Sequence, residues 1–75
     1  MIPVHPGDLL QLRDEDYMYG RGPLTLRVTA VHHVQRLPDG PWVFLRGVEL
    51  AWGGRELDER DVLVRAAALG RVSNG

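Results

Sequence analysis

The sequence predicts a small all-β barrel of about five short strands, with a short helical turn near its C-terminal end. Three observations support this prediction. Apolar and polar residues alternate between residues 24 and 30, which is the period of a half-buried strand. Turns rich in glycine and proline recur along the chain. Finally, 75 residues have room for one compact core, so a single domain is expected over residues 1–75.

The first third of the chain is expected to form a lead-in, a strand and a loop. Two prolines restrict residues 1–6 to an extended lead-in, because proline fixes φ and has no backbone donor. A Gly-Asp pair at 7–8 signals a turn, and Leu9–Arg13 follows as a short strand. The segment Asp14–Pro23 holds three acids, two tyrosines and two glycines without periodicity, which predicts a loop or an irregular hairpin.

The clearest strand is Leu24–Val31, where the alternation is regular. The alternation slips at Ala30 and Val31, which indicates a β-bulge or a sharp bend. Continuation of the strand through His32–Arg36 is compatible with the sequence. The segment Pro38–Pro41 combines proline, aspartate and glycine, and therefore predicts a turn.

Two further segments extend the predicted sheet. Trp42–Leu45 is apolar on both faces, which predicts a central strand or one that is covered on both sides. Gly47 permits a bulge before a strand at Val48–Ala51. The glycine pair at 53–54 can adopt positive φ and predicts a tight hairpin turn.

The C-terminal third allows two interpretations. Asp58–Leu69 could form one helix, with Asp58 as the N-cap and Gly70 just past the end. The alternative is a strand at Asp61–Arg65 followed by a helical turn at Ala66–Leu69. We favour the alternative, because the apolar residues at 62–64 suit a strand and make a poor helical stripe. Residues 71–75 are predicted to be a frayed tail.

Parts of this pattern resemble a known fold family. The stretch Pro6–Leu12, a loop and then Gly22–Val31 resemble the opening hairpin of SH3-like barrels, including KOW-type domains. The resemblance implies an SH3-like barrel and, for the KOW type, contact with nucleic acid. Around the hairpin, however, Asp14–Tyr19 is acidic or aromatic where the KOW type is basic. The chain also resembles short uncharacterised actinobacterial proteins with a Pro-Gly-Asp-Leu opening, which implies no activity.

Composition excludes several classes of chemistry. There is no cysteine, which rules out thiolate metal sites and thiol nucleophiles. The nine basic residues are all arginine and are outnumbered by ten acids, so the basic excess usual in a nucleic-acid-binding domain is missing. No apolar run approaches the length of a membrane-spanning helix. A cytoplasmic location without cofactors is therefore expected.

No catalytic or metal site is predicted. The chain has three histidines, His5, His32 and His33. Adjacent residues of a regular strand point to opposite faces, so His32 and His33 should not share a metal ion. Asp58–Asp61 mixes acids with one arginine, which is typical of a solvated face with partial ion pairing.

The leading hypothesis is a non-catalytic binding or accessory module that contacts another protein, or a second copy of itself, through the barrel surface. A weak nucleic-acid-binding domain is the alternative, and a small enzyme or metal-site protein is the third possibility. The acidic, tyrosine-bearing loop and the alternation after residue 41 suggest the contact residues. The candidates for partner binding are Tyr17, Tyr19, Arg21, Trp42, Phe44, Arg46 and Trp52. An interaction surface would be indicated if the tyrosines and tryptophans gathered on one patch.

Overall fold

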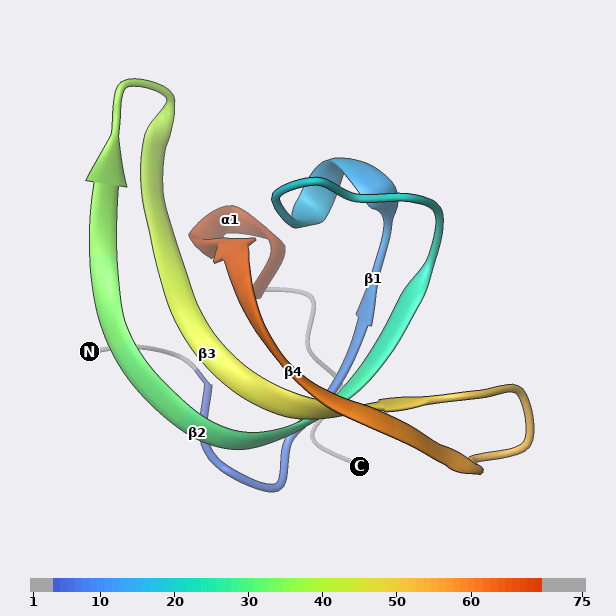
Figure 1. Cartoon of the computed structure of the whole chain (residues 1–75). Coiled ribbons are helices and arrows are strands. Elements are labelled where there is room, and N and C mark those ends of the chain that lie inside the picture. Colours follow the sequence, from blue (N-terminus) through green and yellow to red (C-terminus); the bar gives the residue numbers. More distant parts are fainter. Residues whose placement is uncertain (1–3, 70–75) are drawn as a thin grey trace.

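The computed structural model describes residues 4–69, and it is built almost entirely from strands (Figure 1). The predictions for the start of the lead-in and for the frayed tail at 71–75 lie outside the described residues. The elements, in chain order, are β1 (Leu9–Leu12), the 3-10 helix η1 (Asp14–Asp16), β2 (Leu24–Leu37), β3 (Gly40–Leu50), β4 (Glu56–Arg65) and the helical turn α1 (Ala66–Leu69).

The four strands form one antiparallel sheet in the order β1-β2-β3-β4. Figure 1 shows that the sheet curls strongly, so that α1 lies on its concave side. The architecture is a mostly β, open half-barrel, which confirms the predicted class and the single helical turn. The described chain has four strands where about five short ones were expected.

One continuous strand, β3, covers the expected strand Trp42–Leu45 and most of the expected strand Val48–Ala51, which accounts for the difference in strand number. Two bulges bend the neighbouring strand β2. The pairing of β2 with β3 shifts register twice, between Val28 and Ala30 and again between Val31 and His33. Each shift bends the strand and increases its twist without ending it. As a result, β2 continues to Leu37, and the bulge predicted near Ala30 is present.

The bulge expected at Gly47 is present in the pairing of β2 with β3, but β2 carries its extra residue, Thr29, opposite Gly47 and Arg46. β3 itself runs through Gly47 unbroken, pairing there with Val28 on one side and with Arg60 on the other. A further irregularity lies between Val48 and Leu50 in the pairing of β3 with β4, where β4 carries the extra residue. Gly47 is needed for space: an added Cβ would lie 2.7 Å from the Arg27 carbonyl oxygen and 2.7 Å from Leu26 Cγ.

The C-terminal third adopts the favoured interpretation. Strand β4 ends at Arg65 and α1 occupies Ala66–Leu69, so the single long helix is excluded. The strand begins at Glu56, five residues before the predicted start at Asp61. The early part was missed because residues 56–61 are exposed and almost all charged, which removes the apolar alternation that marks a strand.

One apolar cluster fills the concave side of the sheet. Alternate residues of each strand supply it, and α1 covers one end with Ala68 and Leu69. Trp42 is buried outside this cluster. The fully buried side chains are Leu10, Leu26, Val28, Val43, Leu45, Val64 and Leu69. Neither helical segment in residues 4–69 has the length and apolar character needed to span a lipid bilayer.

Candidate functional site

The loop between β1 and β2 folds back onto the edge of β4. The Met18 amide donates to the Leu63 carbonyl oxygen at 2.9 Å, and Tyr17 forms an isolated antiparallel bridge with Val64. This short contact connects the β1 end of the half-barrel to β4 at its other end. The loop therefore becomes one wall of a groove whose other parts come from the sheet.

Short-range polar contacts hold the loop in shape. The Asp16 carboxylate accepts from the Arg13 amide at 2.8 Å, which closes the first turn. Gly20 lies so close to the backbone of Asp14 that a Cβ there would overlap the Asp14 carbonyl. The phenol of Tyr17 donates to the Gly22 carbonyl oxygen at 2.9 Å and accepts from the amide of the residue before that glycine.

Tyr19 stands out within this loop. Its φ is +60°, a conformation that costs a non-glycine residue energy, and its side chain is 90% exposed. Strained backbone of this kind concentrates at functional sites, where the surrounding structure enforces it. The neighbouring Tyr17 and Gly20 contacts supply that enforcement here.

Removal of the Tyr17 hydroxyl should loosen the loop. In Tyr17→Phe, the Gly22 carbonyl and the Arg21 amide lose a part-buried partner, which is expected to cost about 1–2 kcal/mol of unfolding free energy. Trypsin cleavage after Arg21 should accelerate in the folded protein. Urea unfolding and timed digestion would measure both effects. Unchanged stability together with unchanged cleavage would show that the hydroxyl does not anchor the loop.

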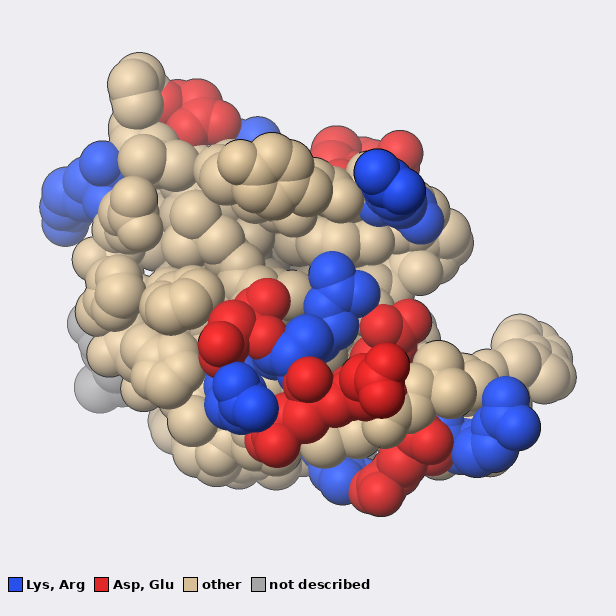
Figure 2. Space-filling view, in the orientation of Figure 1, with Lys and Arg blue, Asp and Glu red and all other residues tan. Residues whose placement is uncertain are grey.

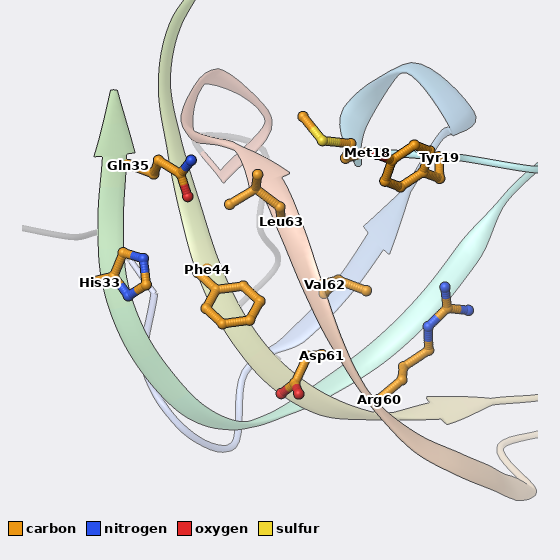
Figure 3. A pocket seen from close by; sticks show the side chains of 9 residues that line it. All are labelled: Met18, Tyr19, His33, Gln35, Phe44, Arg60, Asp61, Val62 and Leu63. Atoms are coloured by element: carbon orange, nitrogen blue, oxygen red, sulfur yellow. The ribbon is translucent and has the colours of Figure 1, made fainter. Parts of the chain in front are cut away.

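The groove beside this loop has a volume of about 370 Å³ (Figure 3). Its walls combine a large apolar area with a few polar groups. The lining residues are Met18, Tyr19, His33, Gln35, Phe44, Arg60, Asp61, Val62 and Leu63. They come from the loop and from β2, β3 and β4, so the groove exists only in the folded chain.

The prediction that His32 and His33 point to opposite faces is wrong. Both rings pack against Phe44, with centroid distances of 5.2 Å and 5.4 Å. The register shift between Val31 and His33 makes His32 the extra residue of a bulge, which cancels the alternation. His32 Nε2 also lies 3.6 Å from the Asp61 carboxylate. Residues 4–69 contain no group of three side chains suited to hold a metal ion.

Ion pairs border the groove along β4. Arg46 lies across the strands and contacts Glu59 at 3.3 Å and Asp61 at 3.2 Å. The hydrogen bond from Arg46 to Asp61 and the two carboxylate charges raise the pKa of Arg46, so its charge is permanent. Figure 2 shows acidic and arginine side chains intermingled on this face. Arg60 is similarly held by Glu49 at 3.1 Å.

Trp42 has a structural role beside the turn between β2 and β3. It is buried, its indole N–H donates to Asp39 at 2.9 Å, and the Arg65 guanidinium lies 4.4 Å from its ring centroid. The same indole hydrogen bond, aided by Arg65 and opposed by slight desolvation, lowers the pKa of Asp39. Trp42 therefore offers little surface to a partner in this conformation.

The structure separates the predicted contact residues. Trp52 is fully exposed in the turn between β3 and β4, which extends away from the body of the sheet (Figure 1). Tyr17 and Trp42 are buried, so the two tyrosines and two tryptophans do not form one patch. Arg21 is exposed, and Arg46 borders the groove without lining it. Only Tyr19 and Phe44 of the predicted set line the groove.

Sequence reasoning missed most of the remaining lining residues. Met18 and Leu63 are brought together by a single backbone hydrogen bond between segments 45 positions apart, and no local pattern signals that contact. The alternation of Asp61 and Leu63 on one face of β4 is visible in the sequence, once the strand is known to extend through them. The comparisons with known proteins found no similar family model, no similar curated protein and no similar solved structure.

Proposed function

We propose that this domain is a non-catalytic binding module that holds a segment of another protein in the groove between the β1–β2 loop and β4. The observation that carries the proposal is the groove itself, whose apolar walls remain open to solvent in a chain of this size. An accessible apolar concavity with a few fixed polar groups is the usual form of a recognition site.

The exposed Tyr19 supports the same proposal. Tyrosine is enriched among interface residues that contribute strongly to binding, because its ring buries apolar area while its hydroxyl bonds at the rim. A tyrosine that is nine-tenths exposed on a strained backbone has no packing role to explain it. Contact with a partner would explain both features.

We further propose that the half-barrel is of the SH3-like kind. The support for this assignment is the consecutive antiparallel order of the four strands, the irregular loop after β1 and the helical turn after β4. The strong bend of β2 at its bulges is a further point of agreement with small barrels.

Selection from a library of random peptides, followed by affinity measurement, tests the proposed function. Peptides selected on the wild-type domain should bind at least about tenfold more weakly to Tyr19→Ala. Trp52→Ala is the matched control, because it removes an equally exposed aromatic side chain that lies outside this groove. It should leave the affinity unchanged.

The outcomes of this selection discriminate clearly. A library that yields no binder, or binders that depend on Trp52 and not on Tyr19, would contradict the proposal. Sedimentation of the domain alone, with and without the Tyr19→Ala change, shows whether a second copy occupies the groove instead. If the domain self-associates and Tyr19→Ala abolishes that association, the partner in the groove is a second copy of this chain and not a foreign protein.

Nucleic acid binding is the alternative function, and its support is the arginine-only basic set. In the described residues, Arg21, Arg36 and Arg55 have no carboxylate partner, whereas the other arginines are ion-paired. Titration with a single-stranded oligonucleotide at about 50 mM salt measures this directly, because phosphate contacts strengthen as salt falls. Binding that disappears in an Arg36→Gln, Arg55→Gln variant would favour the alternative.

A further inference from the structure

The edge of β4 passes through the middle of the groove. Four consecutive residues of this strand, Arg60 to Leu63, line the cavity. Figure 3 shows that they alternate: Asp61 and Leu63 lie on the side of Phe44, whereas Arg60 and Val62 lie on the side of Tyr19. A single face of a strand could not contribute consecutive residues, so the backbone edge itself is accessible there.

The backbone of this edge is open for pairing. β4 is the last strand of the sheet, and its Leu63 carbonyl accepts from Met18 on the side away from β3. Because backbone groups alternate sides along a strand, Asp61 and Glu59 also direct their N–H and C=O groups away from β3. No backbone group in residues 4–69 bonds to them on that side.

The charges along the edge define the kind of partner that fits. Two carboxylates, those of Glu59 and Asp61, share one guanidinium, that of Arg46, and the neighbouring Asp58 has no ion-pair partner in residues 4–69. Arg60 does not offset them, since it is paired with Glu49. A second copy of β4 paired in antiparallel register around Arg60 would place acid opposite acid, which is destabilising. The edge therefore suits a basic strand.

The part of β2 that extends beyond β1 is less suited to pairing. β2 has no described neighbour beyond Val28 on its outer side. It carries two bulges in that part, one before Ala30 and one before His33. Bulges interrupt the regular spacing that an added strand needs and are a common protection of sheet edges.

We infer that an extended, basic segment of a partner protein adds as a strand to the edge of β4. This inference rests on the proposed function and specifies its geometry and its partner chemistry. The segment continues the line that Tyr17 and Met18 begin along β4. Its apolar side chains contact Leu63 and Phe44 on one side and Met18 on the other, while its arginines or lysines lie beside Asp61. Main-chain hydrogen bonds supply affinity in strand addition, and side-chain pockets supply specificity.

Peptide probes with blocked backbone donors test the inference. The parent probe is acetyl-Val-Arg-Val-Arg-Val-Arg-Val-amide, and an analogue with glutamate in place of arginine controls for charge. Two further analogues carry N-methyl groups on the valines or on the arginines. Only alternate residues of an added strand face β4. One methylated analogue should therefore lose at least about tenfold in affinity while the other retains it.

The readout is a titration followed by NMR, with hydrogen exchange at single amides. Saturation with the parent probe should slow exchange of the Asp61 and Glu59 amides, because both become hydrogen-bonded. Amides of β3, which are paired in the free domain, should change little. The glutamate analogue should not bind at concentrations where the arginine probe saturates.

Two substitutions of Asp61 distinguish the contribution of its backbone amide to binding from the contribution of its charge. Asp61→Pro removes an amide that points away from β3, which an edge strand tolerates, whereas Asp61→Asn removes only the charge. The proline variant should bind the parent probe at least about tenfold more weakly than the asparagine variant. The N-methyl analogues decide the question even if the proline variant does not fold.

The possible failures are distinguishable. Library-selected peptides that bind at Tyr19 but are indifferent to both N-methyl patterns would overturn strand addition and leave the proposed function standing. If both methylated analogues bound the domain as tightly as the parent probe does, strand addition would be overturned in the same way. Absence of any peptide binding at the groove would overturn both.

Discussion

Gly47→Ala is expected to lower the free energy of unfolding by about 3 kcal/mol. The added methyl group would lie 2.7 Å from the Arg27 carbonyl oxygen, which is backbone and cannot move aside cheaply. It would meet Leu26 Cγ at the same distance, inside the apolar cluster. Because the backbone of β2 lies this close to β3, relief of the clash requires the central strands to separate. Urea unfolding monitored by circular dichroism gives the change.

Gly54→Ala is the control for this prediction. Gly54 has a φ of +86° and open space around it, so alanine there suffers backbone strain and no clash. The expected cost is about 1 kcal/mol. If the two substitutions proved equally costly, crowding between the central strands would not be the reason for glycine at position 47.

The second large effect is expected from Leu26→Ala. Leu26 is fully buried and sits between Leu10 on β1 and Glu49 on β3, so its side chain joins the opening hairpin to the rest of the core. Such a truncation costs about 2–5 kcal/mol, the upper values applying where the cavity cannot collapse. A domain of 75 residues has roughly 4–11 kcal/mol in total, so this substitution should remove a large share of the stability and shift the urea midpoint clearly downward.

Leu57→Ala supplies the matched control, because Leu57 is an exposed leucine on β4. Its truncation should change stability by at most about 0.5 kcal/mol. The Leu26 variant should also lose peptide binding in the groove before it unfolds globally, since the β1–β2 hairpin supports the loop with Met18 and Tyr19. A Leu26→Ala protein that keeps wild-type stability would contradict the assignment of this residue to the centre of the core.

Several predictions that depended on local pattern are confirmed. The alternation after Leu24 identified β2, the turn at Pro38 and Asp39 separated it from β3, and the alanine run at 66–68 ended β4 in a helical turn. Each of these features is decided by neighbours within a few residues. The charged first half of β4 was missed because an exposed edge strand has no apolar face to mark it.

The candidate site was predicted only in part. Tyr19 and Phe44 belong to the predicted set and do line the groove, yet Tyr17 and Trp42 are buried. Aromatic residues occur both in cores and at interfaces, so their presence in a sequence does not decide between the two locations. The hydrogen bonds of their polar groups do. The Tyr17 phenol and the Trp42 indole each find a partner in a nearby turn, which favours burial.

By itself, the sequence determined that this chain forms a small antiparallel β structure with turns at fixed places and without cysteine chemistry. Only the tertiary structure decided where its surface is concave. The bulge at His32 brought the rings of two adjacent histidines against Phe44, and a hydrogen bond from Met18 to Leu63 placed the loop beside the open edge of β4. Both events depend on register between distant segments, which local sequence does not encode.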